Sequence, residues 1–285
     1  MTLTEESTSR YAQVRVGAQT MRLHYHDAGE GPVVVFLHGA GAGAGGWSNF
    51  SRNLPAFVDA GFRVIALDFP GFHKSEPFVA TTSRTATNAE ALKELLDTLG
   101  VERVHLVGNS LGGASSMAFA LNYPERLEKM VLMGPGSLGP SLFQSLPMEG
   151  IKLLMQLYRE PTRANLDKML QVFVFDPSML TPELVEGRYQ AMMSTPEHLG
   201  NFLSSFQKNP ATLIEDLTPR LPEIKQPTLV IWGRDDRFVP LDYGLRLVWS
   251  LPNADLQVFS RCGHWAQWEH AEKFNRTVID FFHNG

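Results

Sequence analysis

The chain of 285 residues contains one cysteine, Cys262, and no long apolar stretch. A single cysteine cannot form a disulfide within the chain, which fits a reducing compartment. Apolar runs such as residues 33–37 are far shorter than the roughly 20 residues that cross a bilayer. The first ten residues are polar and partly acidic, unlike a secretory signal peptide. We therefore expect a soluble, cytoplasmic protein without a membrane partner.

Positive charge is scarce as well. The chain has 25 lysines and arginines against 30 aspartates and glutamates, a formal net charge of −5, and no run of basic residues. These features argue against a nucleic-acid partner. No pair of histidines or cysteines has zinc-site spacing, and the glycine-rich segment 38–43 does not end in the Lys-Ser/Thr of a phosphate-binding loop. We expect neither a metal nor a nucleotide.

Hydrophobic residues make up 44% of the chain, enough for the core of a large α/β domain. Short apolar runs typical of buried parallel strands occur at 33–37, 64–67, 104–107 and 130–133. Helical patterns alternate with them at 51–60, 88–99 and 113–122. A hairpin is expected before the first run and two strands after the last, at 13–16, 21–26, 228–232 and 256–259. This order predicts an α/β fold with a mostly parallel, doubly wound sheet.

Residues 137–208 break this alternation. They show no convincing parallel strand, and their pattern is that of short helices separated by prolines and rich in methionine and phenylalanine. We interpret the segment as a helical cap inserted into a core formed by residues 1–136 and 209–285. Most of its apolar side chains should pack in the cap's own core. Because the cap would lie over the carboxyl ends of the strands, some of these apolar side chains should also face the crevice where ligands bind.

The strand predicted at 104–107 runs into Gly108-Asn109-Ser110-Leu111-Gly112 and then into a helix of small residues. A sharp turn between strand and helix lifts a serine hydroxyl clear of the sheet, and it needs glycines where the backbones approach. The pattern therefore predicts Ser110 as a nucleophile.

A serine nucleophile needs a base, and the base needs an acid that orients it. In this fold the partners follow in the order serine, acid, histidine. The loop after the strand at 228–232 offers two acids; we favour Asp236, three residues after Gly233, with Asp235 as the alternative. His264, in the loop after the last strand, is the predicted base. Cys262 lies two residues earlier, and we expect no catalytic role for it because the base is already engaged.

An oxyanion needs two donors aimed at it. We predict the backbone amides of Leu111, directly after the nucleophile, and of Ala40, in the glycine-rich loop. His38 precedes that loop, and we interpret it as a structural residue that bonds the backbone. The remaining histidines lack a partnering motif, and His24 and His26 are expected to be a satisfied or solvent-facing pair.

Several motifs together resemble the meta-cleavage-product hydrolases, over nearly the whole chain from about Arg10 to Phe282. They are the segments 43–49, 108–113, 134–136, 232–240 and 262–269. The resemblance is strongest to the biphenyl-pathway branch, which hydrolyses 2-hydroxy-6-oxo-6-phenylhexa-2,4-dienoate to benzoate and 2-hydroxypenta-2,4-dienoate. It implies cleavage of a carbon–carbon bond in a small aromatic-derived dienoate, no metal or organic cofactor, and a homo-oligomer, either a tetramer or an octamer.

The resemblance also implies substrate contacts. Residues at the polar end of the pocket, where the carboxylate and the 2-hydroxy or 2-oxo group bind, would be Asn49, Asn109, Arg188 and Trp265, with Gly39 and Gly41 of the glycine-rich loop. The apolar end would contain Phe173, Ile151 and Val239. Without the resemblance, Arg188 would be interpreted as an arginine on a helix surface. One departure concerns Ala40 and Ala42, because the family has a run of glycines and a proline at this loop.

Other functions keep the same triad or the same fold. A carboxylesterase, lactonase or perhydrolase would use the triad without needing Arg188, Asn49 and Asn109 to converge. A haloalkane dehalogenase is disfavoured because its nucleophile is an aspartate where this chain has Ser110. The fold can also serve as a ligand receptor with little turnover.

Overall fold

The computed structural model, which describes residues 3–143, 146–208 and 215–284, contains one eight-stranded sheet with the strand order β1-β2-β4-β3-β5-β6-β7-β8. The strands are β1 (Ser9–Val16), β2 (Gln19–Ala28), β3 (Val33–Leu37), β4 (Arg63–Leu67), β5 (Val104–Asn109), β6 (Leu127–Met133), β7 (Thr228–Gly233) and β8 (Ala254–Phe259). β2 pairs antiparallel with β1 and β4, and every pairing from β4 to β8 is parallel. The predicted α/β fold with a mostly parallel, doubly wound sheet is confirmed.

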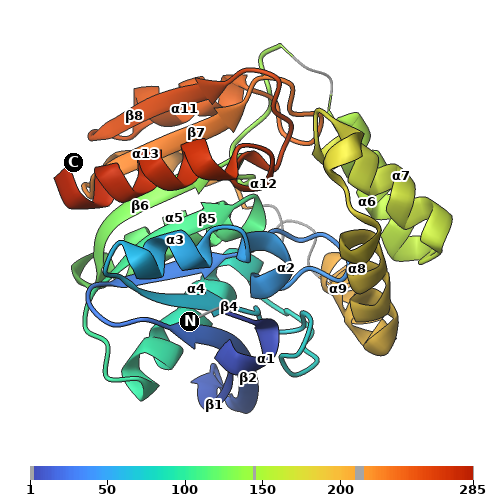
Figure 1. Ribbon diagram of the computed structural model, residues 1–285, viewed down its shortest axis with the longest axis horizontal. Helices are drawn as coiled ribbons and strands as arrows, with labels where there is room; N and C mark the ends of the chain where they lie inside the picture. Colours follow the sequence, from blue (N-terminus) through green and yellow to red (C-terminus); the bar gives the residue numbers. More distant parts are fainter. Residues whose placement is uncertain (1–2, 144–145, 209–214, 285) are drawn as a thin grey trace.

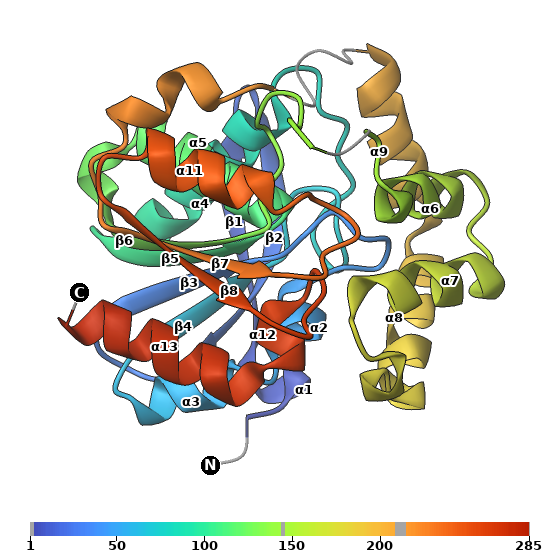
Figure 2. The same ribbon diagram turned by 90° about the horizontal axis from the view of Figure 1, so that it is seen from above.

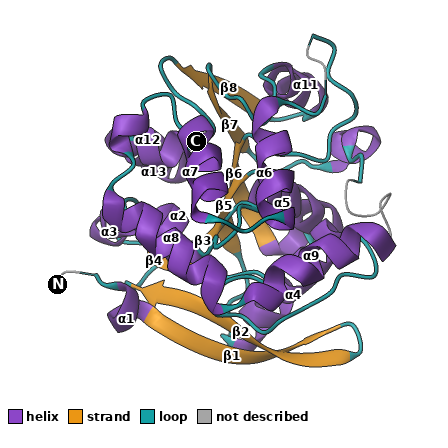
Figure 3. Cartoon of the chain, turned by 90° about the vertical axis from the view of Figure 1, so that its right-hand side faces the viewer, coloured by secondary structure: helices purple, strands orange, loops and turns teal. Residues whose placement is uncertain are grey.

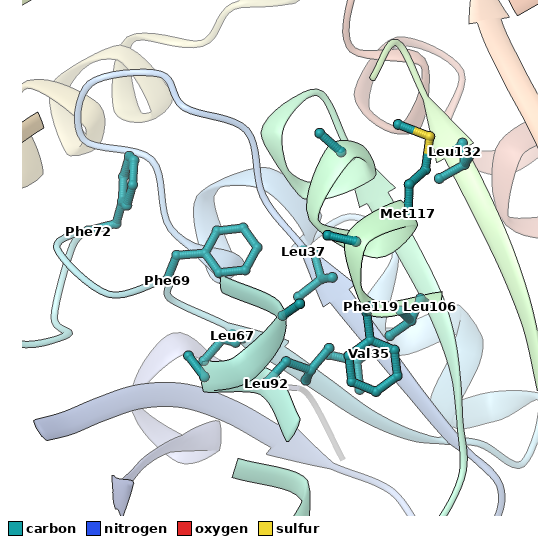
Figure 4. Close-up of a cluster of buried hydrophobic side chains, with 14 of the residues drawn as sticks. Val35, Leu37, Leu67, Phe69, Phe72, Leu92, Leu106, Met117, Phe119 and Leu132 are labelled. Carbon is teal, nitrogen blue, oxygen red and sulfur yellow. The ribbon is translucent and has the colours of Figure 1, made fainter. Parts of the chain in front are cut away.

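Helices cover both faces of the sheet (Figures 1 and 2). One face carries α2 (Gly46–Phe50), α3 (Leu54–Asp59), α12 (Ala266–Glu269) and α13 (Ala271–Asn284); the other carries α4 (Arg84–Thr98), α5 (Leu111–Asn122) and α11 (Asp242–Ser250). Each face has its own buried apolar cluster. Figure 4 shows part of the larger one, in which Val35, Leu37 and Leu106 of the sheet meet Leu92 of α4 and Phe119 of α5. The strands are therefore buried on both sides, which explains their continuous apolar runs.

One predicted helix, at 51–60, differs from the structure. The chain forms α2 and α3 instead, separated by residues 51–53. α2 begins early because the Gly46 amide donates to the buried Asp68 carboxylate at 2.7 Å. Asn53 lies between the helices, and its side chain donates to the Gln267 carbonyl and the Asn275 side chain. Tertiary hydrogen bonds, which local periodicity does not reveal, set these helix ends.

Four further helices lie together at one end of the sheet, and Figure 3 views them face on. They are α6 (Glu149–Arg159), α7 (Arg163–Phe173), α8 (Pro182–Ser194) and α9 (Pro196–Lys208). Among the described residues of 137–208 there is no strand, as the prolines and the helical spacing predict. The limits of this segment as a separate cap stay a prediction. None of the helices that the structure describes is long and apolar enough to cross a membrane.

Buried histidines make the folded state sensitive to acid. Burial lowers the pKa of His26, His38 and His105 from the ordinary 6.5 to about 4. Between these two values the unfolded chain binds protons that the folded chain excludes, so the free energy of unfolding decreases as the pH falls.

We expect this loss to begin below about pH 6.5 and to be complete near pH 4. Each unit of depressed pKa corresponds to about 1.4 kcal/mol, so acid removes a large part of the ~5–15 kcal/mol of an ordinary domain. Urea unfolding at about pH 7, 5.5 and 4.5 measures the effect. His105→Phe should reduce the slope, because the His105 ring stacks on Phe282 and a phenyl ring cannot titrate. A free energy of unfolding that is constant over this range would contradict the expectation.

Candidate active site

Ser110 lies in a strained turn between β5 and α5. Its φ of 53° and ψ of −113° place it in a region that residues other than glycine rarely occupy. A Cβ on Gly108 would meet the Gly112 carbonyl oxygen at 2.5 Å, and one on Gly112 would meet the Leu37 carbonyl oxygen at 2.0 Å. Both positions therefore require glycine. The turn leaves Ser110 partly exposed, while Asn109 before it and Gly112 after it are buried. A nucleophile requires such access.

His264 and Asp236 form a buried pair at the ends of neighbouring strands. His264 Nδ1 lies 2.8 Å from Asp236 Oδ2. Because a carboxylate only accepts, Nδ1 carries the proton and Nε2 is left to accept one. Asp236 Oδ1 accepts from the amides of Phe238 and Val239 at 2.7 and 3.0 Å, which fixes the carboxylate. The geometry thus brings together an orienting acid and a base.

The alternative acid, Asp235, points elsewhere. It forms an ion pair with Arg234 at the surface, and its Oδ2 accepts from the Cys262 amide at 3.4 Å. Of the two aspartates that the sequence offers, the structure places Asp236 against the histidine.

Ser110 and His264 face one cavity. In the described part of the chain the Ser110 hydroxyl makes no hydrogen bond with His264, and such contacts often tighten only when substrate is bound. The lining residues come from the core loops and from α6, α7 and α8: Gly39, Ala40, Gly41, Asn49, Asn109, Ser110, Ile151, Leu154, Phe173, Arg188, Phe238, His264 and Trp265.

Two backbone amides near Ser110 are free to act as donors. Leu111 is the first residue of α5, so its amide has no partner within the helix. Ala40 lines the cavity in the loop after β3. Neither amide donates to another group within the part of the chain that the structure describes. When a serine oxygen adds to a carbonyl carbon, the carbonyl oxygen becomes negatively charged. A helix N-terminus and a second amide can together stabilise that charge.

Arg188 is a buried cation without a counter-ion. It lies on α8 with 1% of its surface exposed, and among the described residues no carboxylate pairs with it. Nη1 donates to Ser48 Oγ at 3.3 Å, whereas Nε and Nη2 are buried without partners. Burial lowers its pKa to about 10, so it stays charged at neutral pH. A Cβ on Gly41 would lie 2.6 Å from Nη2, so the guanidinium packs closely against the backbone of this glycine. An anionic ligand in the cavity would offset the cost of burying this charge.

The two asparagines add polar groups to the same cavity. Asn109 Nδ2 donates to the carbonyls of Met133 and His264, and its Oδ1 is buried without a partner. Asn49 is 2% exposed, and its Nδ2 donates to the Gly45 carbonyl at 2.9 Å. A Cβ on Gly39 would lie 3.3 Å from Asn109 Oδ1. The unpaired oxygen of Asn109 can accept a hydrogen bond from a hydroxyl group of a ligand.

Part of the cavity lining is apolar. Phe173 stacks on Trp265 and on Phe238, with ring centroids 4.6 and 4.2 Å apart. Ile151 and Leu154 of α6 complete this part. Val239, predicted here, does not line the cavity; its amide instead holds Asp236. Sequence reasoning missed Phe238 and Leu154, although Leu154 lies three residues after Ile151, on the same face of a helix.

Sequence reasoning also missed Glu269, which joins the loop of His264 to the chain just after α7. Its two carboxylate oxygens accept from the amides of Gly263 and Phe175, each at 2.6 Å. The His264 amide donates to the Phe173 carbonyl at 2.7 Å. Burial raises the pKa of the Glu269 carboxyl. The loop that carries the base is thus fastened to the end of α7.

The other candidates are structural. His38 Nδ1 donates to the Gly39 carbonyl and its Nε2 accepts from the Phe69 amide, as predicted for a residue that bonds the backbone. Cys262 is buried, and burial raises the pKa of its thiol. No group of three or more His, Cys, Asp or Glu able to hold a metal occurs among the described residues.

Comparisons with known proteins cover nearly the whole chain. Residues 32–271 match the model of the family described as alpha/beta hydrolase fold. The chain is 57% identical to a 2-hydroxy-6-oxo-6-phenylhexa-2,4-dienoate hydrolase from Comamonas testosteroni, covering 98% of each chain. It is 58% identical to a 2-hydroxy-6-oxononadienedioate/2-hydroxy-6-oxononatrienedioate hydrolase from Paraburkholderia phymatum, covering 99% of this chain and 98% of the relative. The solved 2-hydroxy-6-oxo-6-phenylhexa-2,4-dienoate hydrolase from Rhodococcus sp. strain RHA1 superposes with a TM-score of 0.82 at 30% identity, covering 97% of this chain and 100% of that one.

Proposed function

Since the chain belongs to the α/β-hydrolase fold family and, within it, to the meta-cleavage-product hydrolases, we propose that its substrate is 2-hydroxy-6-oxo-6-phenylhexa-2,4-dienoate. The products would be benzoate and 2-hydroxypenta-2,4-dienoate. Breaking this carbon–carbon bond by acyl transfer requires a serine triad, an oxyanion hole and a site for the dienoate carboxylate.

One observation carries the proposal: Arg188 presents two unpaired, buried N–H groups to the cavity that Ser110 also lines. Its fork matches a carboxylate by two parallel hydrogen bonds. An esterase acting on a neutral ester would leave this charge buried without a partner. A substrate whose carboxylate pairs with Arg188 while its reacting carbon lies at Ser110 would offset the free-energy cost of burying the guanidinium charge.

In the proposed reaction, Asn49, Asn109, Arg188 and Trp265 bind the polar end of the substrate, which there changes from its dienol to its keto form. The proton of the 2-hydroxyl group moves to carbon 5. Ser110 Oγ then bonds to the carbonyl carbon 6, while its proton passes to His264 Nε2 and Asp236 stabilises the resulting cation. The Ala40 and Leu111 amides hold the oxyanion.

Collapse of this intermediate breaks the bond between carbons 5 and 6. The electron pair flows along the conjugated chain to the 2-oxo oxygen, which takes the proton from His264, and Arg188 stabilises the charge that spreads toward it. The benzoyl group stays on Ser110. A water molecule then gives a proton to His264, attacks the acyl carbon and releases benzoate, and the proton returns to Ser110 Oγ. The net reaction consumes one water.

The apolar side of the cavity supports a phenyl substituent over an acidic one. Ile151, Leu154, Phe173 and Phe238 face this side, and apart from His264 the only cationic side chain among the described lining residues is Arg188. The second carboxylate of a nonadienedioate would be desolvated there without a cation.

We expect kcat/KM to be at least about 100-fold higher for the 6-phenyl dienoate than for 2-hydroxy-6-oxononadienedioate. Loss of the yellow dienoate absorbance measures both rates. Leu154→Arg, which adds a cation to the apolar side, should shift the ratio toward the diacid, while Leu154→Met should leave it near its original value. If the parent enzyme preferred the diacid, the phenyl substituent would be the wrong assignment. The reaction class, hydrolysis of a carbon–carbon bond, would still hold.

We also propose that the cap comprises residues 137–208, that the protein works in the cytoplasm, and that it assembles as a homo-oligomer, a tetramer or an octamer. The family resemblance supports the cap and the assembly, and the single cysteine supports the location. Light scattering coupled to size-exclusion chromatography measures the assembly.

A further inference from the structure

A tyrosine of the cap segment bonds directly to the oxyanion loop. Tyr158, near the end of α6, places its hydroxyl 2.6 Å from the carbonyl oxygen of Ala40. The residue is 3% exposed, and its ring stacks on Phe202 of α9 with centroids 4.5 Å apart. Burial raises the pKa of Tyr158, so the hydroxyl keeps its proton and donates it to the Ala40 carbonyl.

The Ala40 carbonyl belongs to the peptide that follows the predicted oxyanion donor. Peptide planarity ties this carbonyl to the Gly41 amide. The Ala40 amide lies across the Ala40 Cα in the preceding peptide, so a bond to the carbonyl restrains the ψ of Ala40 and holds the backbone of the residue that carries the donor. Within the described loop 39–43, the only hydrogen bond between two backbone groups is the one in which Gly41 accepts from the Ala44 amide at 2.9 Å, and His38 Nδ1 donates to the Gly39 carbonyl. The loop thus has little internal support, and Tyr158 supplies a contact from outside.

The neighbouring loop residues also rest on the cap segment. A Cβ on Gly41 would meet Arg188 and Phe173, and one on Gly43 would meet the Arg188 carbonyl oxygen at 2.4 Å. Helices α6, α7 and α8 therefore all contact this loop. Tyr158 is the described residue of these helices whose side chain donates to one of the loop's peptide groups, while His38, which precedes the loop, donates to the Gly39 carbonyl.

We infer that Tyr158 is a positioning residue of the oxyanion hole. By holding the Ala40 carbonyl it restrains the backbone of Ala40, whose amide faces the oxygen formed on attack by Ser110. The oxyanion hole is then complete only when α6 is seated on the loop. This inference rests on the proposed acyl transfer at Ser110. Tyr158 would then stabilise the transition state and leave the binding of the dienoate unchanged.

Tyr158→Phe tests the inference, because it removes the hydroxyl and keeps the ring that stacks on Phe202. We expect kcat for the 6-phenyl dienoate to fall about tenfold, less than the ~10²–10³-fold cost of deleting an oxyanion donor, with KM changed by less than about twofold. Benzeneboronic acid bonds through its boron to Ser110 Oγ and places one oxygen of the tetrahedral boronate in the oxyanion hole. Its affinity should fall by a similar factor.

Ground-state binding separates positioning from a structural effect. The Kd of the 6-phenyl dienoate for Ser110→Ala and for Ser110→Ala/Tyr158→Phe should agree within about twofold. Tyr189→Phe is the matched control, because Tyr189 lies on α8 beneath Arg163 and does not line the cavity. Partial unfolding of a variant would not mimic the result. Protein that stays unfolded changes neither Kd, and reversible unfolding would raise the Kd of the dienoate and the Kd of benzeneboronic acid by the same factor.

Unchanged kcat and boronic-acid affinity in Tyr158→Phe would overturn the inference, and so would an equal loss of dienoate affinity in the Ser110→Ala background. Failure of the proposed function would look different: the parent enzyme would neither cleave the dienoate nor bind benzeneboronic acid at Ser110.

Discussion

Replacing Ser110 by alanine is expected to lower the rate of dienoate cleavage by about 10⁴-fold or more. The variant loses the atom that forms the acyl bond, while the oxyanion donors and Arg188 remain. Single-turnover stopped-flow measurements of the dienoate absorbance give this rate without interference from product release. Binding of the dienoate should persist, because the polar end of the cavity does not depend on the serine hydroxyl.

Ser116→Ala is a matched control for that variant. Ser116 is a buried serine of α5, the helix that follows Ser110, and its hydroxyl donates to the Gly112 carbonyl at 2.8 Å. We expect its rate to stay within about twofold of the parent, because the residue lies outside the cavity. A single-turnover rate in Ser110→Ala equal to that of the parent would rule out nucleophilic attack by Ser110.

Arg188→Ala is expected to lower kcat/KM for the dienoate by about 10²- to 10³-fold. The change removes the only buried cation that we assign to the substrate carboxylate and to the charge on the departing dienolate. It should therefore both raise KM and lower kcat. Hydrolysis of a nitrophenyl ester, which has no carboxylate, should change far less. Steady-state kinetics on the two substrates measure the contrast.

Two variants complete the test of Arg188. Arg163→Ala, also on the cap segment, removes an arginine whose partners are Asp167 and Glu186 at the surface, and it should leave both reactions unaltered. Arg188→Met should keep or raise the melting temperature, because it replaces an unpaired buried charge by an apolar chain of similar length. Equal kinetics of Arg188→Ala and the parent on the dienoate would remove Arg188 from the site.

The sheet could be predicted from the sequence because its strands are buried on both faces. Each parallel strand therefore appears as a continuous apolar run, as at 33–37, where the predicted and observed bounds coincide. The ends of α2 and α3 were not predictable in this way. They depend on Asp68 and Asn53, whose partners lie elsewhere in the chain.

The predicted triad rests on local motifs, and the structure places its three members at the carboxyl ends of β5, β7 and β8. The turn around Ser110 needs glycines at fixed positions, which makes it visible in sequence. The contacts from α6 to α9 are not visible, because they depend on how helices far apart in sequence pack. From its surroundings in the sequence, Arg188 resembles a surface arginine, and nothing in the pattern around Tyr158 or Glu269 predicts their bonds to Ala40 and Gly263.

The most direct test of the central claim is to identify the products of the purified enzyme acting on 2-hydroxy-6-oxo-6-phenylhexa-2,4-dienoate. We predict loss of the yellow absorbance and equal amounts of benzoate and 2-hydroxypenta-2,4-dienoate, measured by chromatography against both standards. If the dienoate were recovered intact while a nitrophenyl ester was hydrolysed by the same preparation, the chain would be an esterase and the account of Arg188 and its cavity would be contradicted.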